Sequence, residues 1–188
     1  MPSGALVWWL DLHPKARVQE MKQMGRQNYF AYGSNMNPTQ MGNRCPAAVA
    51  LGVVTLPGWD IAINERGVAT ILRADSSDEP VAMEGVLWSV TDGCLETLDR
   101  FEGVRAGVYR RQEVRIVGAD EDVAAIAYVA SSRGHGDPRP GYLETILEGA
   151  DHFKISPAYR IRLERLSGVE GASAESGPSS RRRPTGSI

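Results

Sequence analysis

Short runs of β-branched and aromatic residues, separated by turn residues at irregular intervals, constrain the fold of this 188-residue chain more than any other feature. From Asn28 onward these runs alternate with Gly, Pro, Asn and Asp, which end strands and form turns. Helical segments are inserted between the runs without the regular strand–helix alternation of a doubly wound sheet. The pattern therefore predicts an α+β fold, expected as a small, partly closed barrel. Strands are predicted at 29–32, 49–56, 59–64, 68–73, 81–90, 109–117 and 123–131.

Capping residues predict where the helices begin. Asn37 followed by Pro38 is typical of an N-cap and a first helical position. A further helix is predicted over 142–149, and a last one from Ser156 to about residue 166. These helices lie between or after the strand runs, as an α+β fold requires.

One more helix is predicted to begin after Thr91 or Asp92 and to end near Glu102–Gly103. Apolar residues at helical spacing give it a stripe that ends at Phe101, which is therefore expected on or near the core side. Gly103 can take positive φ and would end the helix. Glu84, in the middle of a predicted strand, is expected on that strand's exposed face.

The chain is predicted to have one folded domain over residues 28–166. Residues 1–27 read as an N-terminal extension, either an extra helix packed on the domain or a segment ahead of a true start at Met21 or Met24. Residues 167–188 are mostly Gly, Ser, Pro, Glu and Arg, a composition typical of a disordered tail.

Charge and composition exclude several classes of function. The net charge is −2 with both signs mixed along the chain, which argues against nucleic acid as a partner because phosphate binding needs a basic patch. No apolar run is long enough to cross a bilayer. The two cysteines, Cys45 and Cys94, read as reduced, which predicts a cytoplasmic protein. The three histidines lack metal-ligand spacing, so no metal site is expected.

The turn Gly33–Ser34 is the first candidate for chemistry. A strand ends at Tyr32, a glycine bends the chain, and a helix begins a few residues later. Successive N–H groups in such a turn can hold a carboxylate or an oxyanion. The alternative is an ordinary strand-to-helix turn, since the segment matches neither common Gly-rich phosphate loop nor the elbow of a serine hydrolase.

Glu102 is the second candidate, at the predicted helix end beside Gly103. A carboxylate there could be partly desolvated, which would raise its pKa toward a value useful for proton transfer. It also faces the unfavourable end of the helix dipole, so something other than stability could have placed it there. The alternative is a solvated glutamate at a helix terminus. Tyr109 and Tyr142 could belong to the core, the rim or the ligand site.

The order and spacing of three motifs resemble the γ-glutamylcyclotransferase family. Residues 29–36 (YFAYGSNM) are similar to that family's opening signature. Residues 98–109 (LDRFEGVRAGVY) are similar to its catalytic segment, and Pro140–Gly141–Tyr142 with Ser156–Pro157 to its C-terminal part. The likeness runs from about Asn28 to residue 166.

The resemblance implies a mixed α+β fold around a small barrel, and a reaction that uses neither metal nor organic cofactor. It implies a lyase- or acyltransferase-type reaction that cyclises a γ-glutamyl group to 5-oxoproline, as in glutathione metabolism. Glu102 matches the catalytic glutamate. Asn35 favours the general branch of the family over the glutathione-specific branch. The implied substrate-binding residues are Tyr29, Phe30, Ala31, Tyr32, Gly33, Ser34 and Tyr142.

Three interpretations of the function stay open at this point. The general one is cyclisation of γ-glutamyl-amino acids; a second is a γ-glutamylamine or a biosynthetic γ-glutamyl-protected compound as substrate. A third is ligand binding without catalysis. The expected partner is a small-molecule γ-glutamyl peptide or amide, without nucleic acid or membrane, in a chain that could form a homodimer. The loop over 131–142 is expected to line the pocket mouth around the leaving group.

Overall fold

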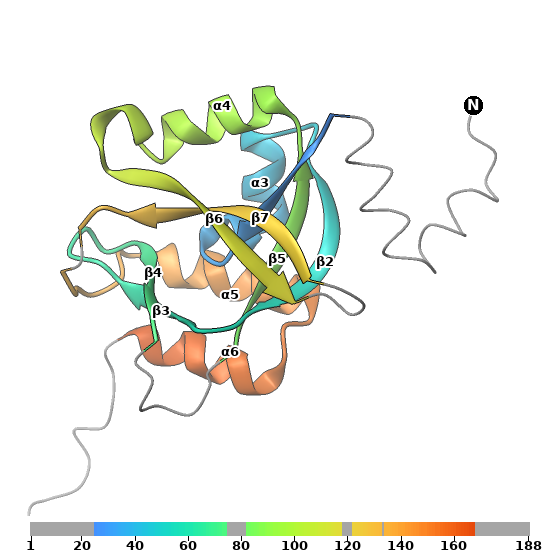
Figure 1. The fold of residues 1–188 in the computed structure, drawn as a ribbon. Coiled ribbons are helices and arrows are strands. Elements are labelled where there is room, and N and C mark those ends of the chain that lie inside the picture. Colours follow the sequence, from blue (N-terminus) through green and yellow to red (C-terminus); the bar gives the residue numbers. More distant parts are fainter. Residues whose placement is uncertain (1–24, 75–81, 118–121, 133, 168–188) are drawn as a thin grey trace, which may run out of the picture.

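The computed structural model describes residues 25–74, 82–117, 122–132 and 134–167 (Figure 1). The predicted N-terminal extension and C-terminal tail therefore lie almost entirely outside the described residues. Within the described part, no helix is long and apolar enough to cross a membrane.

Five strands form a closed barrel, which confirms the predicted α+β fold. The sequence predicted a barrel that is only partly closed, whereas the strands of the structure close it fully. Around the barrel the strands run in the order β1 (Gln27–Ala31), β5 (Met83–Val90), β2 (Val49–Leu56), β6 (Tyr109–Val117) and β7 (Asp122–Ala130). Neighbours are antiparallel except β1 and β7, which pair in parallel where Tyr29 meets Ile126 and so close the barrel.

The second strand carries a β-bulge. The register of β2 against β5 shifts between Ala50 and Gly52, and Gly52 has φ +128. This φ is one that glycine adopts readily and residues with a Cβ rarely adopt. Bulges of this kind increase local twist and curvature, which helps a five-stranded sheet to close.

A separate two-stranded hairpin, β3 (Trp59–Ile63) and β4 (Ala69–Arg73), lies beside the barrel. Its turn is fixed by Asn64, which is fully buried and whose Oδ1 accepts a hydrogen bond from the Arg66 N–H at 2.9 Å. Gly67 completes the turn with φ +72. Hydrogen bonds to Asn64 thus fix the conformation of the hairpin tip.

The helices flank the barrel. Figure 1 shows α4 (Asp92–Phe101) above the strands and α6 (Pro157–Glu164) below them, with α3 (Pro38–Arg44) and α5 (Tyr142–Phe153) between. Short 3₁₀ helices occur at η1 (Ser34–Met36), η2 (Val104–Ala106) and η3 (Arg165–Ser167).

The predicted N-caps are confirmed. The Asn37 side chain accepts hydrogen bonds from the N–H groups of Thr39 and Gln40, and that of Thr91 accepts one from Cys94. Helix α5 continues to Phe153 instead of ending at residue 149.

Two predicted side-chain positions are wrong. Phe101 is 59% exposed and not in the core, because the helix turns its buried stripe of Cys94, Leu95 and Leu98 inward and leaves the last residue outside. Glu84 is half-buried, because its carboxylate accepts hydrogen bonds from the N–H and the hydroxyl of Ser156 at the start of α6.

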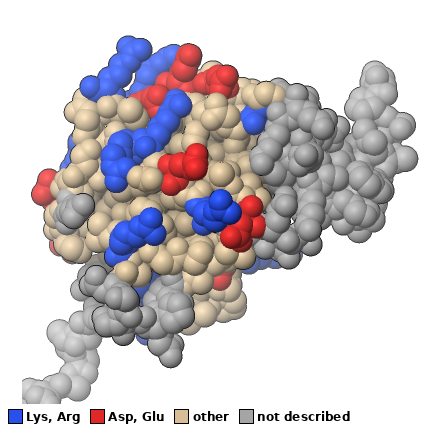
Figure 2. Space-filling model, viewed as in Figure 1, with Lys and Arg blue, Asp and Glu red and all other residues tan. Residues whose placement is uncertain are grey.

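Charged side chains of both signs are interspersed over the face shown in Figure 2. This arrangement matches the mixed charge pattern of the sequence.

Candidate active site

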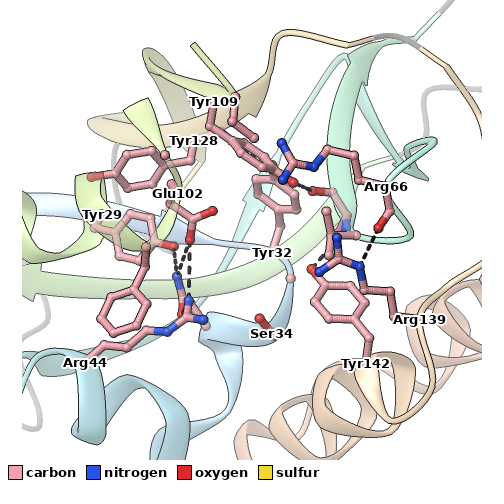
Figure 3. Close-up of a pocket in the computed structure, with 17 residues that line it drawn as sticks. Tyr29, Tyr32, Ser34, Arg44, Arg66, Glu102, Tyr109, Tyr128, Arg139 and Tyr142 are labelled. Carbon is pink, nitrogen blue, oxygen red and sulfur yellow. Dashed lines mark hydrogen bonds and ion pairs between the residues drawn. The ribbon is translucent and has the colours of Figure 1, made fainter. Parts of the chain in front are cut away.

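A cavity of about 230 Å³ opens where the barrel, the β3–β4 hairpin and the ends of three helices meet (Figure 3). That volume is below the roughly 300–1,000 Å³ of most ligand pockets and suits a small molecule. Its lining residues are Tyr29, Tyr32, Gly33, Ser34, Asn35, Arg44, Arg66, Val68, Ala69, Phe101, Glu102, Gly103, Val108, Tyr109, Tyr128, Arg139 and Tyr142.

Glu102 reaches the cavity from the C-terminal end of α4. It is the C-cap residue, and Gly103 directly after it has φ +64, which lets the chain turn away. A Cβ at residue 103 would lie 3.1 Å from Val108 Cγ2, so a side chain there would crowd the turn. Figure 3 shows the Glu102 carboxylate turned toward the pocket. The local sequence thus explains how a helix-terminal glutamate becomes a pocket residue.

The two carboxylate oxygens of Glu102 have different surroundings. Oε1 lies 3.3 Å from Asn35 Nδ2 and 3.5 Å from Arg44 Nη1. Oε2 has no hydrogen-bond donor among the described residues, and the side chain is 17% exposed. Burial raises the pKa of Glu102, and the Arg44 charge and the Asn35 hydrogen bond offset only part of that rise. One oxygen is therefore anchored, while the other is available to exchange a proton.

Asn35 links the groups around Glu102. It is buried, its Nδ2 donates to the Tyr29 hydroxyl at 2.8 Å, and its Oδ1 accepts from Arg44 Nη1 at 2.8 Å and from Gln40 Nε2 at 3.1 Å. The Arg44 guanidinium also lies over the Phe101 ring, 4.6 Å from its centroid. These contacts hold the carboxylate in one orientation.

Besides Tyr29, four tyrosines line the pocket, Tyr32, Tyr109, Tyr128 and Tyr142, and all four hydroxyls are hydrogen-bonded to the protein backbone. Tyr32 donates to the Tyr128 carbonyl, and Tyr109 donates to the Ala69 carbonyl at 2.7 Å. The Tyr142 hydroxyl accepts from the Ala69 N–H at 3.0 Å, so its own proton can be donated elsewhere. Burial raises the pKa of Tyr32, Tyr109 and Tyr142, so these phenols stay neutral and act as hydrogen-bonding groups, not as bases.

The Gly33–Ser34 turn lies against Tyr142. Its backbone hydrogen bonds run from the Met36 N–H to the Gly33 carbonyl and from the Asn37 N–H to the Ser34 carbonyl. The N–H groups of Ser34 and Asn35 have no backbone carbonyl partner among the described residues, and the Ser34 N–H interacts with the Tyr142 hydroxyl. A Cβ at Gly33 would lie 3.0 Å from the Tyr142 hydroxyl, which explains the need for glycine here. The turn can therefore present N–H groups to an anion.

The structure brings most of the predicted site residues together. Glu102, Tyr29, Tyr32, Gly33, Ser34 and Tyr142 all line the cavity. Phe30 and Ala31 do not: both are buried in the core, and the Phe30 ring packs where Gly85 leaves space. They hold β1 in place and are not part of the pocket surface.

Sequence reasoning missed several lining residues. Arg44, Arg66 and Tyr128 were not predicted, Arg139 was predicted only as part of the loop over 131–142 at the pocket mouth, and Asn35 was noted only as a mark of the family branch. No local pattern distinguishes these arginines from solvated ones, since they reach the pocket only through the packing of α3 and the hairpin turn. Among the described residues, no cluster of three His, Cys, Asp or Glu side chains could hold a metal ion.

The fold is a closed α+β barrel similar to that of a solved γ-glutamyl cyclotransferase. The sequence model of the AIG2-like family matches residues 82–163. A crystal structure of an uncharacterized human protein has a TM-score of 0.67 at 27% identity, covering 74% of this chain and 87% of that one. A structure named γ-glutamyl cyclotransferase has a TM-score of 0.67 at 25% identity, covering 83% of this chain and 94% of that one.

Relatives known by name agree with the fold. The mouse γ-glutamylcyclotransferase is 27% identical over 149 residues, which cover 73% of this chain and 77% of that protein. The human γ-glutamylcyclotransferase is 26% identical with the same coverage. The chain thus resembles the γ-glutamylcyclotransferase family in sequence and in structure.

Proposed function

We propose that this protein is a γ-glutamylcyclotransferase that converts γ-glutamyl-amino acids to 5-oxoproline and releases the amino acid. One observation carries the proposal: the Glu102 carboxylate, half-buried and with a raised pKa, faces a small pocket beside the Gly33–Ser34 turn, and its Oε2 has no hydrogen-bond donor among the described residues. The named relatives support the same reaction class.

The substrate supplies its own nucleophile in this reaction. Its α-amine attacks the γ-carbonyl carbon, a C–N bond forms and closes a five-membered lactam, and the original amide C–N bond breaks. The substrate's ammonium group loses two protons on becoming the lactam N–H, the first before the attack, and the leaving nitrogen gains two on departing as an ammonium group. Glu102 Oε2 accepts these protons one at a time and passes them to the leaving nitrogen, so the carboxylate ends the cycle as it began.

The pocket supplies the remaining requirements. The Ser34 and Asn35 N–H groups hold the glutamyl α-carboxylate or the oxyanion that forms on the γ-carbonyl. The Tyr142 hydroxyl can donate a hydrogen bond to whichever of these anions the turn holds. Because the cavity is small, the substrate binds folded, with its amine close to its γ-carbonyl, which lowers the entropic part of the barrier.

The test is release of 5-oxoproline, measured by mass spectrometry, from γ-glutamyl-L-alanine and from glutathione. We expect turnover of the dipeptide, and for Glu102→Gln a loss of roughly 10²–10⁴ in kcat. Arg115→Gln, an exposed change on β6 away from the pocket, is the matched control and should keep the wild-type rate.

A Glu102→Gln variant with near-normal kcat would contradict the assigned role. Binding of both compounds without any 5-oxoproline would indicate ligand binding without catalysis. Turnover of γ-glutamylamines, without turnover of either peptide, would indicate that γ-glutamylamines are the substrates.

A further inference from the structure

The pocket holds more positive charge than the chemistry at Glu102 requires. Its charged lining residues are three arginines, Arg44, Arg66 and Arg139, against the single Glu102, an excess of two positive charges. Arg44 is already engaged by Glu102 and Asn35. The positive charges of Arg66 and Arg139 are therefore not explained by Glu102.

These two arginines lie together on the wall opposite Glu102. Figure 3 shows Arg139 beside Tyr142 and the Arg66 side chain extending toward Tyr109, both across the pocket from Arg44. No carboxylate among the described residues forms an ion pair with either of them. Both are exposed at the pocket mouth, so the charges are hydrated and open to a ligand.

Hydrogen bonds to the hairpin backbone hold Arg139 beside the backbone of Arg66. Arg139 donates from its N–H to the Gly67 carbonyl at 3.0 Å and from Nε to the Arg66 carbonyl at 2.6 Å. The Gly136 N–H also donates to the Ile63 carbonyl at 3.1 Å. The hairpin tip and the segment that carries Arg139 are thus joined, and Nη1 and Nη2 of Arg139 stay free among the described residues.

Gly67 is what allows this close approach. A Cβ there would lie 2.7 Å from Arg139 Cγ and 2.9 Å from the Asp137 carbonyl oxygen, and its φ of +72 favours glycine. The close approach of Arg139 to the hairpin therefore depends on glycine at residue 67.

We propose that Arg66 and Arg139 form a subsite for the carboxylate of the leaving amino acid. The inference rests on the proposed function and deepens it, because it names the substrate class. The glutamyl α-carboxylate shares a carbon with the α-amine, so it must stay on the Glu102 side, near the Ser34 and Asn35 N–H groups. The carboxylate of the leaving residue lies beyond the scissile amide and reaches the opposite wall.

Charge balance favours the same assignment. A γ-glutamyl-amino acid carries two carboxylates and one ammonium group, a net charge of −1, which complements a pocket with excess positive charge. A γ-glutamylamine lacks the second carboxylate and would leave the arginine pair without a partner. Arginine is also the side chain best suited to bind a carboxylate through two parallel hydrogen bonds.

The experiment compares γ-glutamyl-L-alanine with γ-glutamyl-L-alaninamide, which has the same shape but no terminal charge. The wild type should show a higher kcat/KM for the acid. In Arg66→Gln/Arg139→Gln, kcat/KM for the acid should fall roughly 10- to 100-fold, as expected for lost charge-assisted hydrogen bonds, while that for the amide stays nearly constant. Arg115→Gln, which is exposed on β6, should keep the preference.

A binding measurement separates this proposal from the proposed function. Calorimetry on Glu102→Gln, with and without the two arginine changes, reports acid and amide affinity without turnover. A preference for the acid that disappears with the arginines supports the subsite even if no 5-oxoproline forms. Equal affinity for acid and amide, a preference that survives in the double variant, or no binding of either compound overturns it.

Discussion

At the scale of single residues, Glu102 combines two opposing environments. Burial favours its neutral form, while Arg44 and Asn35 favour the charged form, and burial dominates. A carboxyl with a raised pKa is protonated more readily than an ordinary glutamate, which suits a group that both takes and returns a proton. The raised pKa also makes the stability of the protein depend on pH, which can be measured without substrate.

We expect Glu102→Gln to unfold at a higher temperature than the wild type at pH 7. A raised folded-state pKa means that the folded protein binds the Glu102 proton more tightly, so wild-type stability falls as pH rises from the usual value of 4.5 to the raised one. Glutamine resembles the protonated form and escapes this loss. The gain should be absent below about pH 4 and constant above the raised pKa.

Thermal unfolding of both proteins between pH 4 and pH 8, followed by circular dichroism, measures this difference. An advantage of the variant that grows toward low pH would contradict the sign of the shift.

At the scale of elements, the close packing of α5 on η1 joins the Tyr142 end of the pocket to the Ser34 turn. Gly149 allows that contact, since a Cβ there would lie 2.6 Å from the Asn37 backbone nitrogen and 2.7 Å from the Met36 carbonyl carbon. Backbone atoms cannot move aside as a flexible side chain can. The glycine thus serves packing in the middle of a helix where it would otherwise weaken it.

We predict that Gly149→Ala lowers the free energy of unfolding by about 1–3 kcal/mol, as overpacking does, and also lowers activity by shifting η1. Gly42→Ala in α3 is the matched control, because a Cβ at Gly42 meets nothing within 4 Å. The control should be neutral or more stable by about 0.5–1 kcal/mol. Urea unfolding of both variants checks this, and equal effects would refute the packing role of Gly149.

Elements were more predictable than their arrangement. The caps at Asn37 and Thr91 depend on neighbouring residues and could be predicted from the sequence. The barrel order could not, because the pairing of β1 with β5 and β7 is decided by distant segments. The predicted burial of Phe101 was wrong for a related reason. Apolar spacing predicts which face of a helix is buried, but not at which residue that face stops contacting the core.

The candidate site shows the same division. Glu102 and the Gly33–Ser34 turn could be predicted because a helix end beside glycine and a strand-ending glycine are local features. The loop that carries Arg139 was also expected at the pocket mouth, but its contact with Arg66 could not be predicted, because the two residues are 73 positions apart and meet only in the folded chain.

At the scale of the whole molecule, the described body has a single core that includes both cysteines. Cys45 is 2% exposed and Cys94 is 5% exposed, both are free, and the Cys45 thiol donates to the Cys94 carbonyl at 3.5 Å. Burial raises the pKa of Cys45 to about 12, so its thiol stays protonated. Desolvation is outweighed at Cys94 by hydrogen bonds with Thr91, which lower its pKa, so the protection of that thiol rests on its burial.

We expect neither cysteine to react appreciably with a thiol reagent such as DTNB in the native protein, and both to react after denaturation in guanidinium. Because α3 and α4 pack with the barrel, the slow native-state reaction should follow global unfolding and accelerate in Gly149→Ala. Rapid labelling of one thiol under native conditions, at a rate independent of stability, would show that this region opens locally.

The parallel pairing of β1 with β7 closes the barrel between segments far apart in the chain, as the hydrogen bond from Tyr32 to the Tyr128 carbonyl, 96 positions away, illustrates. Bringing such distant segments together is slow and costs conformational entropy, and a partly closed barrel gains few of the contacts that offset this cost. During synthesis, a nascent chain would therefore lack a working pocket until the segment carrying Tyr142 had emerged from the ribosome. Catalytic competence should then appear in one late step, with no partly active precursor.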